Sequence, residues 1–311
     1  NPRAMVHILL LSLAMGASVS AVTLSTGDTV AVLGASGNVG KLVALRLADT
    51  YKVHAVVRDA SKVSSFLQRD SIRLFEADIN GGDTQALEEA LTTANAVVVC
   101  TGTTAFPTQA WSKSGDSEVS GAVLKALFQC RFSVPDALAQ LDAQGFNTPQ
   151  NVDTEGMKRV LSVWQLASGE RKRFIMMSSI GVQRRTQMPF PILDACGVLS
   201  AKASAEDALI ADASAAGYSY TIVRPGQLFG GPYDNNYYLG TLFQLDKDES
   251  EQDVVCSSGD TLVGDTLRST LAEVIAQVCE QDAAVDMDFS VVNGKGAPPA
   301  ISALRERLAM L

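Results

Sequence analysis

The sequence GASGNVG, from Gly34 to Gly40, lies between a short apolar run, VAVL at residues 30–33, and a helical pattern that begins at Lys41. Glycine allows a tight turn and a close approach of the backbone to a pyrophosphate, and the amides at a helix start attract its negative charge. We therefore predict a strand, a phosphate-binding turn and a helix, with helix–strand packing as the alternative reason for the glycines. The predicted phosphate-binding residues are Gly34, Ala35, Ser36, Gly37, Asn38, Val39 and Gly40.

Strand and helix patterns alternate along the chain after Thr29. Fully apolar runs such as AVVV at residues 96–99 indicate strands that are covered on both faces, as in a parallel sheet. The alternation predicts an α/β fold, a doubly wound parallel sheet of the Rossmann type. The expected strands are Thr29–Leu33, Val53–Val57, Ile72–Phe75, Ala96–Val99, Phe174–Met177 and Ser219–Val223; the expected helices are Val39–Ala48, Thr84–Thr92, Thr154–Leu166 and Ala203–Ala215.

Two regions interrupt the alternation, so we divide the chain into parts. Residues 28–311 form one NAD(P)-binding domain in this interpretation, with an insertion near residues 104–150 that holds a helix near Val123–Phe128. A small C-terminal substrate lobe is expected near residues 226–311. The elements expected in that lobe are a helix near Thr266–Cys279, a strand near Asp288–Val292 and a last helix near Ala300–Ala309.

The N-terminal segment Val6–Leu24 contains 19 residues without a formal charge. Arg3 precedes it, and the small residues Ser18–Ala21 resemble a signal-peptidase site. We expect residues 1–27 to be a targeting segment or a membrane anchor, so membrane association through Val6–Leu24 is one expectation. A helix that packs on the domain is the third alternative.

The charge and the cysteine pattern exclude several classes of function. A net charge of −9 with no basic tract argues against binding to nucleic acid. The five cysteines form no CxxC pair, and the two histidines lie far apart in the sequence. We therefore expect no metal centre, no disulfide framework and no His-dependent hydrolase triad.

The residue after the second strand indicates which cofactor binds. Arg58 can form a bidentate contact with a 2′-phosphate, which favours NADP(H). Asp59 follows it and could hold a ribose 2′-hydroxyl, so NAD(H) remains possible. A surface arginine in a turn is the alternative interpretation of Arg58.

Other cofactor contacts are expected at the ends of the next strands. Asp78 and Ile79 follow the third strand and would meet the adenine, although Asp78 could instead form the turn before Asn80. Small residues after the fourth strand would let the backbone pass beneath the nicotinamide ribose; they are Thr101, Gly102 and Thr103.

Candidate catalytic residues follow the fifth strand and begin the next helix. Ser178 and Ser179 lie at a carboxyl edge of the sheet, where a hydroxyl could hold a substrate carbonyl. Lys202 could bind the ribose hydroxyls and lower the pKa of a neighbouring group, or it could pair in solvent with Glu206 at i+4. Cys100 is expected to be a small buried residue and not a nucleophile.

Several motifs together resemble one family. GASGNVG, VVRD, SSIGV, the AKxxxE segment and YTIVRPG are similar to atypical short-chain dehydrogenase/reductases of the NAD(P)H-binding, NmrA-like kind. CTGTTAFP at residues 100–107, VDxxG at residues 152–156, GVLxxK at residues 197–202, GPY at residues 231–233 and GDxLxG at residues 259–264 resemble the plastid members of plants and algae. The resemblance implies a chloroplast location and adds Pro225 of the RPG motif to the cofactor-binding residues.

One departure from this family concerns catalysis. The reductases with a complete catalytic set have a tyrosine four residues before the lysine, where this chain has Val198. Ser178, Ser179, water or a tyrosine of the loop after Gly226 would have to replace it; the loop tyrosines are Tyr233, Tyr237 and Tyr238.

We therefore carry two functional hypotheses forward. The resemblance implies an NADP(H)-dependent oxidoreductase that acts on a small or lipophilic plastid substrate. The alternative is an NADP(H)-binding scaffold or assembly factor for a photosynthetic protein complex.

Overall fold

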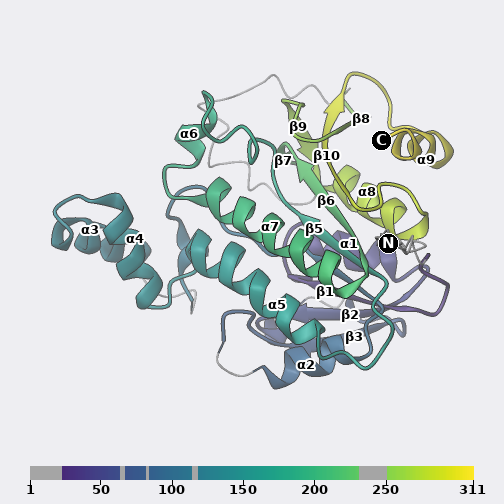
Figure 1. Ribbon diagram of the computed structural model, residues 1–311, viewed down its shortest axis with the longest axis horizontal. Helices are drawn as coiled ribbons and strands as arrows, with labels where there is room; N and C mark the ends of the chain where they lie inside the picture. Colours follow the sequence, from purple (N-terminus) through teal and green to yellow (C-terminus); the bar gives the residue numbers. More distant parts are fainter. Residues whose placement is uncertain (1–22, 64–66, 82–83, 114–117, 231–250) are drawn as a thin grey trace, which may run out of the picture.

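The central element of the structure is an eight-stranded sheet. The computed structural model describes residues 23–63, 67–81, 84–113, 118–230 and 251–311 (Figure 1). The strand order is β3-β2-β1-β4-β5-β6-β10-β8, and every pair is parallel except β10 with β8. The strands are β1 Thr29–Leu33, β2 Lys52–Val57, β3 Ile72–Glu76, β4 Ala96–Val99, β5 Arg173–Met177, β6 Ser219–Pro225, β8 Asp253–Ser258 and β10 Met287–Gly294.

Helices cover both faces of the sheet, because its central strands are apolar throughout. All four residues of β4 are buried. The helices α2 Gln85–Thr92, α5 Gly156–Trp164 and α7 Val198–Ala216 pack on the face that is in front in Figure 1. The helices α1 Gly40–Leu47 and α8 Arg268–Glu280 pack on the other. This arrangement confirms the predicted doubly wound α/β fold.

Two helices begin earlier than the sequence pattern predicts. Helix α7 begins at Val198, five residues before the expected start, because Asp194 accepts hydrogen bonds from the amides of Leu199 and Ser200. The predicted helix Thr154–Leu166 begins with the π-helical segment η4, Gln150–Glu155, which leads directly into α5. The spacing of apolar residues in the sequence indicates neither the hydrogen bonds of Asp194 nor the π-helical segment, since both depend on local backbone geometry.

The C-terminal part of the chain extends the central sheet, whereas the sequence predicts a small lobe. Strand β10 runs parallel to β6, and β8 pairs antiparallel with β10. Burial of Phe289 and Val291 explains this placement, since both side chains lie in the main core. The remaining elements here are β7 Gln227–Phe229 and β9 Asp265–Leu267, which form a separate two-stranded sheet, and α9 Ile301–Ala309.

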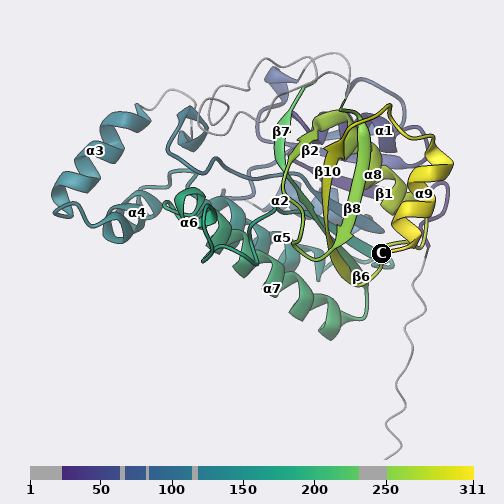
Figure 2. The same ribbon diagram turned by 90° about the horizontal axis from the view of Figure 1, so that it is seen from above.

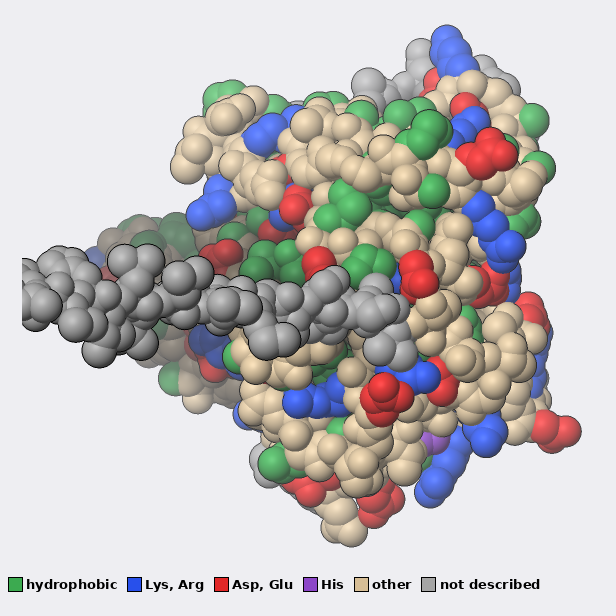
Figure 3. Space-filling model, turned by 45° about the vertical axis from the view of Figure 1, so that its right-hand side comes forward, with side chains coloured by type: hydrophobic (Ala, Val, Ile, Leu, Met, Phe, Trp, Pro, Cys, Tyr) green, Lys and Arg blue, Asp and Glu red, His purple; other side chains and the backbone are tan. Residues whose placement is uncertain are grey.

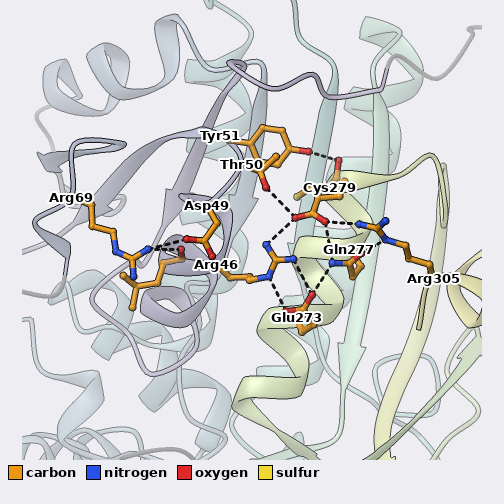
Figure 4. Close-up of polar contacts among 11 residues, drawn as sticks. Arg46, Asp49, Thr50, Tyr51, Arg69, Glu273, Gln277, Cys279 and Arg305 are labelled. Atoms are coloured by element: carbon orange, nitrogen blue, oxygen red, sulfur yellow. Dashed lines mark hydrogen bonds and ion pairs between the residues drawn. The ribbon is translucent and has the colours of Figure 1, made fainter. Parts of the chain in front are cut away.

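A network of charged side chains fastens α1 to α8 (Figure 4). Arg46 donates to both carboxylate oxygens of Glu273 and to Glu280. Arg305 of α9 donates to Glu280 on the other side. Tyr51 donates its hydroxyl hydrogen to the carbonyl of Cys279. The helix that opens after the glycine turn is thereby held against the C-terminal helices.

The insertion between β4 and α5 forms a helical hairpin that projects from the body of the molecule in both views (Figure 1, Figure 2). Its own small core contains Trp111, Ala126 and Leu141. Trp111 also donates from Nε1 to the carbonyl of Thr104 at the hairpin's base. The elements of this region are η3 Gln109–Trp111, α3 Val119–Gln129 and α4 Val134–Ala143; two other short elements are η1 Ala60–Lys62 and α6 Phe190–Leu193.

Most of the N-terminal segment Val6–Leu24 lies outside the described residues. Its last residue, Leu24, is buried in the main core. Within the described part of the chain, no helix is both long and apolar enough to cross a membrane. The targeting and anchoring expectations for residues 1–27 stay predictions.

Acidic and basic side chains are interspersed on the face that Figure 3 shows. The described side chains of this face form no wide basic area, and the expectation that the chain does not bind nucleic acid stays a prediction.

Candidate functional site

The glycine turn fits closely between β1, β4 and α1. Gly34 has a φ of +76°, and a Cβ there would lie 3.1 Å from the amide nitrogen of Thr101. A Cβ on Gly40 would lie 2.1 Å from the carbonyl oxygen of Gly34. The amides of Gly34 and Ala35 both donate to the carbonyl of Val56, at 3.1 Å. The glycines therefore serve packing, and the first two amides of the turn are already bonded.

The next amides of the turn remain available. The backbone amides of Ser36, Asn38 and Val39 form no hydrogen bond with any described residue. They precede the first residue of α1, where free N–H groups and the helix dipole favour an anion. A narrow cleft of about 180 Å³ opens beside them, and Gly34, Ser36 and Gly37 line it. The other four predicted phosphate-binding residues lie in the turn but do not line this cleft, and they are Ala35, Asn38, Val39 and Gly40.

The cleft brings together most of the remaining predicted cofactor residues. The exposed Arg58 lines it, and its guanidinium forms no hydrogen bond or ion pair with any described residue. Asp78 lines it as well but also accepts from the amide of Asn80 at 2.9 Å, so it has the turn-forming contact too. Cys100 lines the inner wall, where burial raises the pKa of its thiol to about 12. The other predicted residues that line this cleft are Ile79, Thr101, Gly102 and Thr103.

Lys202 forms a buried ion pair with Asp153 of η4. Its Nζ lies 2.8 Å from Asp153 Oδ1, and both residues are less than one-tenth exposed. The amide of Thr103 donates to the other carboxylate oxygen of Asp153, at 3.4 Å. Burial raises the pKa of the Asp153 carboxyl, and the Lys202 charge offsets part of this effect. Lys202 is therefore not the solvated partner of Glu206 that the i+4 spacing also allowed.

A second, larger cavity of about 690 Å³ adjoins the cleft, because Thr103 lines both. Ser179 and Lys202 line this cavity. Its only cations among the described residues, Lys202 and Arg184, are both paired; Arg184 donates to Asp260 and to the Leu262 carbonyl. Most of its wall is apolar, formed by Ala105, Ile180, Met188, Pro189, Phe190, Leu193, Val198, Leu199, Leu228 and Val263.

The cleft lies at the carboxyl ends of β1 and β4, where the strand order reverses and Rossmann folds bind dinucleotides, and the larger cavity continues along the ends of β5 and β6. Residues 34–282 match the NAD(P)H-binding family, and this match spans most of the chain. The chain belongs to the NAD(P)H-binding family. No curated protein matches the sequence of this NAD(P)H-binding protein.

Solved structures of bacterial proteins share its fold. The oxidoreductase YlbE from Lactococcus lactis superposes with a TM-score of 0.58 at 18% identity, over 91% of this chain and 97% of that one. ChuY, an anaerobillin reductase from Escherichia coli O157:H7, superposes with a TM-score of 0.56 at 18% identity, over 88% of this chain and 100% of that one. A wide-type short-chain dehydrogenase/reductase from Veillonella parvula was solved in complex with NADP. It superposes with a TM-score of 0.52 at 15% identity, over 88% of this chain and 99% of that one.

Ser178 faces away from both described cavities of the NAD(P)H-binding protein. It is buried, and its hydroxyl hydrogen is donated to Glu206. Glu206 also accepts two hydrogen bonds from Arg224, at 2.9 and 2.6 Å. Of the two predicted catalytic serines, the geometry therefore places only Ser179 at the larger cavity, and it gives Ser178 a contact in a buried charge cluster. Pro225, another predicted cofactor residue, is buried in β6 and lines neither described cavity.

The position of the missing tyrosine is an apolar part of the cavity wall. Val198 is 6% exposed and lines the larger cavity close to Lys202. The loop tyrosines Tyr233, Tyr237 and Tyr238, proposed as replacements, lie outside the described residues. Ser179 is thus the described hydroxyl that both lines the cavity and was predicted from sequence.

Sequence reasoning missed Asp153 as a site residue. The VDxxG motif contains this residue, but the motif entered only as part of the family resemblance and gave Asp153 no role. The signal was present, since a carboxylate in an otherwise apolar helix face needs a buried partner. That partner, Lys202, lies 49 positions away in the sequence, and only the packing of η4 against α7 joins them.

Proposed function

We propose that this NAD(P)H-binding protein is an NADP(H)-dependent oxidoreductase that acts on a small, uncharged lipophilic carbonyl compound or quinone. The observation that carries the proposal is the shared wall at Thr103, where the cleft beside the glycine turn meets an apolar cavity. A dinucleotide is longer than the cleft, so its nicotinamide end would extend past Thr103 toward Lys202 and Ser179. When bound, the nicotinamide supplies or accepts the hydride.

The preference for NADP(H) rests on Arg58. Its guanidinium lies at the cleft and has no partner among the described residues, so it is available for a 2′-phosphate. The cleft fits the group in two further respects. Gly34 and Gly37 line it without a side chain, and the amide of Ser36, which also lines it, remains free.

Lys202 would act on the substrate oxygen. Its ammonium group is held beside Gly102, where an added Cβ would lie 3.4 Å from Nζ. Because glycine has no side chain, the approach to Nζ from the cleft is open. A fixed positive charge at this point would stabilise negative charge that develops on a carbonyl oxygen. Asp153 is a positioning residue in this proposal, because its carboxylate orients Lys202 without lining the cavity. The Ser179 hydroxyl donates to the Ile180 carbonyl at 3.0 Å and would have to rotate to donate a hydrogen bond to the same oxygen.

The charges of the cavity favour an uncharged substrate. Lys202 and Arg184 are engaged by Asp153 and Asp260, and Asp265 adds a further carboxylate to the wall. A substrate phosphate or carboxylate would therefore lack a free cation among the described lining residues. Neutral aldehydes, ketones and quinones with apolar bodies fit the wall.

The test is oxidation of NADPH by the purified protein with a panel of aldehydes, isoprenoid ketones and quinones. We expect turnover with at least one uncharged member, faster with NADPH than with NADH. Lys202→Met combined with Asp153→Asn, which leaves no unpaired buried charge, should abolish that turnover while NADPH binding persists. Tight NADPH binding without turnover on the whole panel would contradict the proposal.

A second candidate function is a cofactor-binding scaffold, and Val198 is the observation that favours it. A buried aliphatic side chain at the position of the usual proton donor is compatible with binding without catalysis. The resemblance of the CTGTTAFP and GVLxxK motifs to plastid proteins supports a chloroplast location and a photosynthetic complex as the scaffold's partner. Retention of the NADPH-loaded chain on thylakoid complexes, without turnover, would support this candidate.

A further inference from the structure

The helical hairpin of α3 and α4 carries an exposed apolar stripe. Leu124, Phe128 and Phe132 follow one another at intervals of four residues and are 69%, 75% and 70% exposed. Leu124 and Phe128 belong to α3, where side chains at this interval lie on one face of the helix, and Phe132 lies just beyond its end. The hairpin projects from the body of the molecule (Figure 2), and the exposure of these three side chains places the stripe on its surface.

The stripe is not part of the hairpin's own core. The opposite face of α3 supplies Val119 and Ala126 to that core, where they meet Ala137 and Leu141 of α4. The hairpin has therefore already buried one apolar face, and the exposed phenyl rings are additional. Two large aromatic side chains that stay exposed on a projecting element indicate an interaction surface.

The connection between the two helices presents the rings together. Phe132 has a φ of 63° and donates its amide hydrogen to the carbonyl of Leu127, at 2.7 Å. This conformation ends α3 and directs Phe132 back toward Phe128, with ring centroids 6.4 Å apart in an edge-on contact. The two rings thus form one apolar tip.

The charge around this tip is opposite to that of the whole chain. Lys125 and Arg131 flank the rings and are both exposed. Residues 119–135 contain no aspartate or glutamate, and the nearest acidic residues in the sequence are Glu118 and the exposed Asp136; the chain as a whole has a net charge of −9. The tip therefore complements an anionic surface, and the rest of the chain is on average repelled by one.

We propose that the hairpin tip docks on the surface of an anionic lipid bilayer. Phe128 and Phe132 would enter the interface between headgroups and acyl chains, while Lys125 and Arg131 would remain among the phosphates. A second copy of this chain fits less well, because a stable interface takes about 20–30 residues a side and this stripe offers only a few large side chains.

The hairpin is also connected to the apolar cavity. Cys196, between α6 and α7, packs against the hairpin's core, and α6 contributes Phe190 and Leu193 to the cavity wall. Docking would therefore bring the cavity that would take a lipophilic substrate near a lipid surface. The docking itself does not depend on the proposed oxidoreductase activity, and its test requires no substrate.

The experiment is co-sedimentation of the full chain with vesicles of phosphatidylcholine alone or mixed with phosphatidylglycerol. We expect stronger binding to the mixed vesicles. Phe128→Ser with Phe132→Ser should weaken that binding about tenfold or more, through loss of buried apolar area. Lys125→Glu with Arg131→Glu should remove the preference for phosphatidylglycerol. Leu166→Ser, at an equally exposed leucine outside the hairpin, should change nothing.

Every variant keeps residues 6–24, so any lipid affinity of that segment is the same in all samples. All the substituted side chains are exposed, so each variant should keep the wild-type melting temperature. Phe128→Trp should show a blue-shifted emission on the mixed vesicles. Binding that is equal in wild type and both double variants would overturn the proposal. So would a dimer in solution that the serine variant dissociates, since the stripe would then be an interface between copies.

Discussion

Lys202 Nζ lies 2.8 Å from Asp153 Oδ1, in a buried pair at the junction of the cofactor cleft and the apolar cavity. The pair connects η4 to α7, two segments that contribute to different walls of the site. It therefore combines a structural role with a proposed catalytic one, and the two roles can be separated by substitution.

Asp153→Asn should lower stability and turnover together. Removal of one partner from a buried ion pair leaves an uncompensated charge and costs about 3–5 kcal/mol. The double variant Asp153→Asn with Lys202→Met should recover most of that stability but none of the turnover, because the ammonium group is gone. Urea unfolding and NADPH oxidation measure the two effects. Glu155→Gln, an exposed neighbour in η4, is the control and should change neither. Turnover that persists in the double variant would remove Lys202 from the mechanism.

Arg58→Gln should weaken NADPH binding more than NADH binding. Loss of a charge-assisted hydrogen bond to the 2′-phosphate corresponds to about 1.5–3 kcal/mol, and NADH has no such phosphate. Calorimetric titration of both cofactors checks the difference. Arg73→Gln removes an exposed arginine from the neighbouring strand and should leave the ratio of the two affinities unchanged. An equal loss for NADPH and NADH in Arg58→Gln would refute the 2′-phosphate contact.

The sequence predicts the sheet because its strands are marked by local composition. AVVV at β4 and VAVL in β1 are apolar on both faces, which only a covered parallel strand satisfies. The predicted strands match the observed ones within two residues at each end. Strand β8 was missed, since its sequence DVVCSS has only three consecutive apolar residues between polar ends, too short a run to indicate a strand.

The site is less predictable, because the residue type at the end of a strand does not determine the direction in which its side chain points. Ser178 and Ser179 are adjacent and chemically identical, so the sequence does not show which of the two lines the cavity. Consecutive side chains alternate across an extended backbone, and one hydroxyl turns to Glu206 while the other lines the cavity. The partner of Lys202 is equally unpredictable, since Glu206 is close in sequence and Asp153 is close in space.

Ser178→Ala and Ser179→Ala should therefore have opposite signatures. Ser178→Ala removes a hydrogen bond from a buried carboxylate and should reduce the free energy of unfolding by about 1–3 kcal/mol, with turnover per folded molecule unchanged. Ser179→Ala should reduce turnover and leave stability near wild type. Thermal unfolding and NADPH oxidation with an active substrate distinguish them. The reverse pattern would restore Ser178 as the catalytic serine.

Gly40→Ala should destabilise the whole glycine turn. The added methyl group would lie 2.1 Å from the Gly34 carbonyl oxygen, which is backbone and cannot rotate away. We expect the melting temperature to fall and NADPH affinity to fall with it, because the free amides before α1 would be displaced. Gly121→Ala is the matched control, since its new methyl group would be no closer than 3.5 Å to any atom and the helix gains alanine's propensity. A Gly40→Ala variant with wild-type stability and affinity would show that the turn can shift freely.

His54 should make stability depend on pH in the acid range. It is buried in β2, its Nδ1 lies 2.7 Å from the Ala90 carbonyl oxygen, and burial lowers its pKa from the usual value. The unfolded chain takes up a proton at about pH 6.5, while the folded chain resists it. The free energy of unfolding should therefore fall as pH decreases through and below that value, by at most about 1.4 kcal/mol per pH unit for this group.

Urea unfolding of wild type and His54→Gln between about pH 7.5 and 5.5 isolates this contribution. Glutamine stays neutral over the range and can still donate to the Ala90 carbonyl, so the variant should lose less stability on acidification than wild type does. Other titrating groups are common to both proteins and cancel in the comparison. Parallel pH profiles would mean that His54 takes up its proton in the folded chain as readily as in the unfolded one, which its buried position between β2 and α2 argues against.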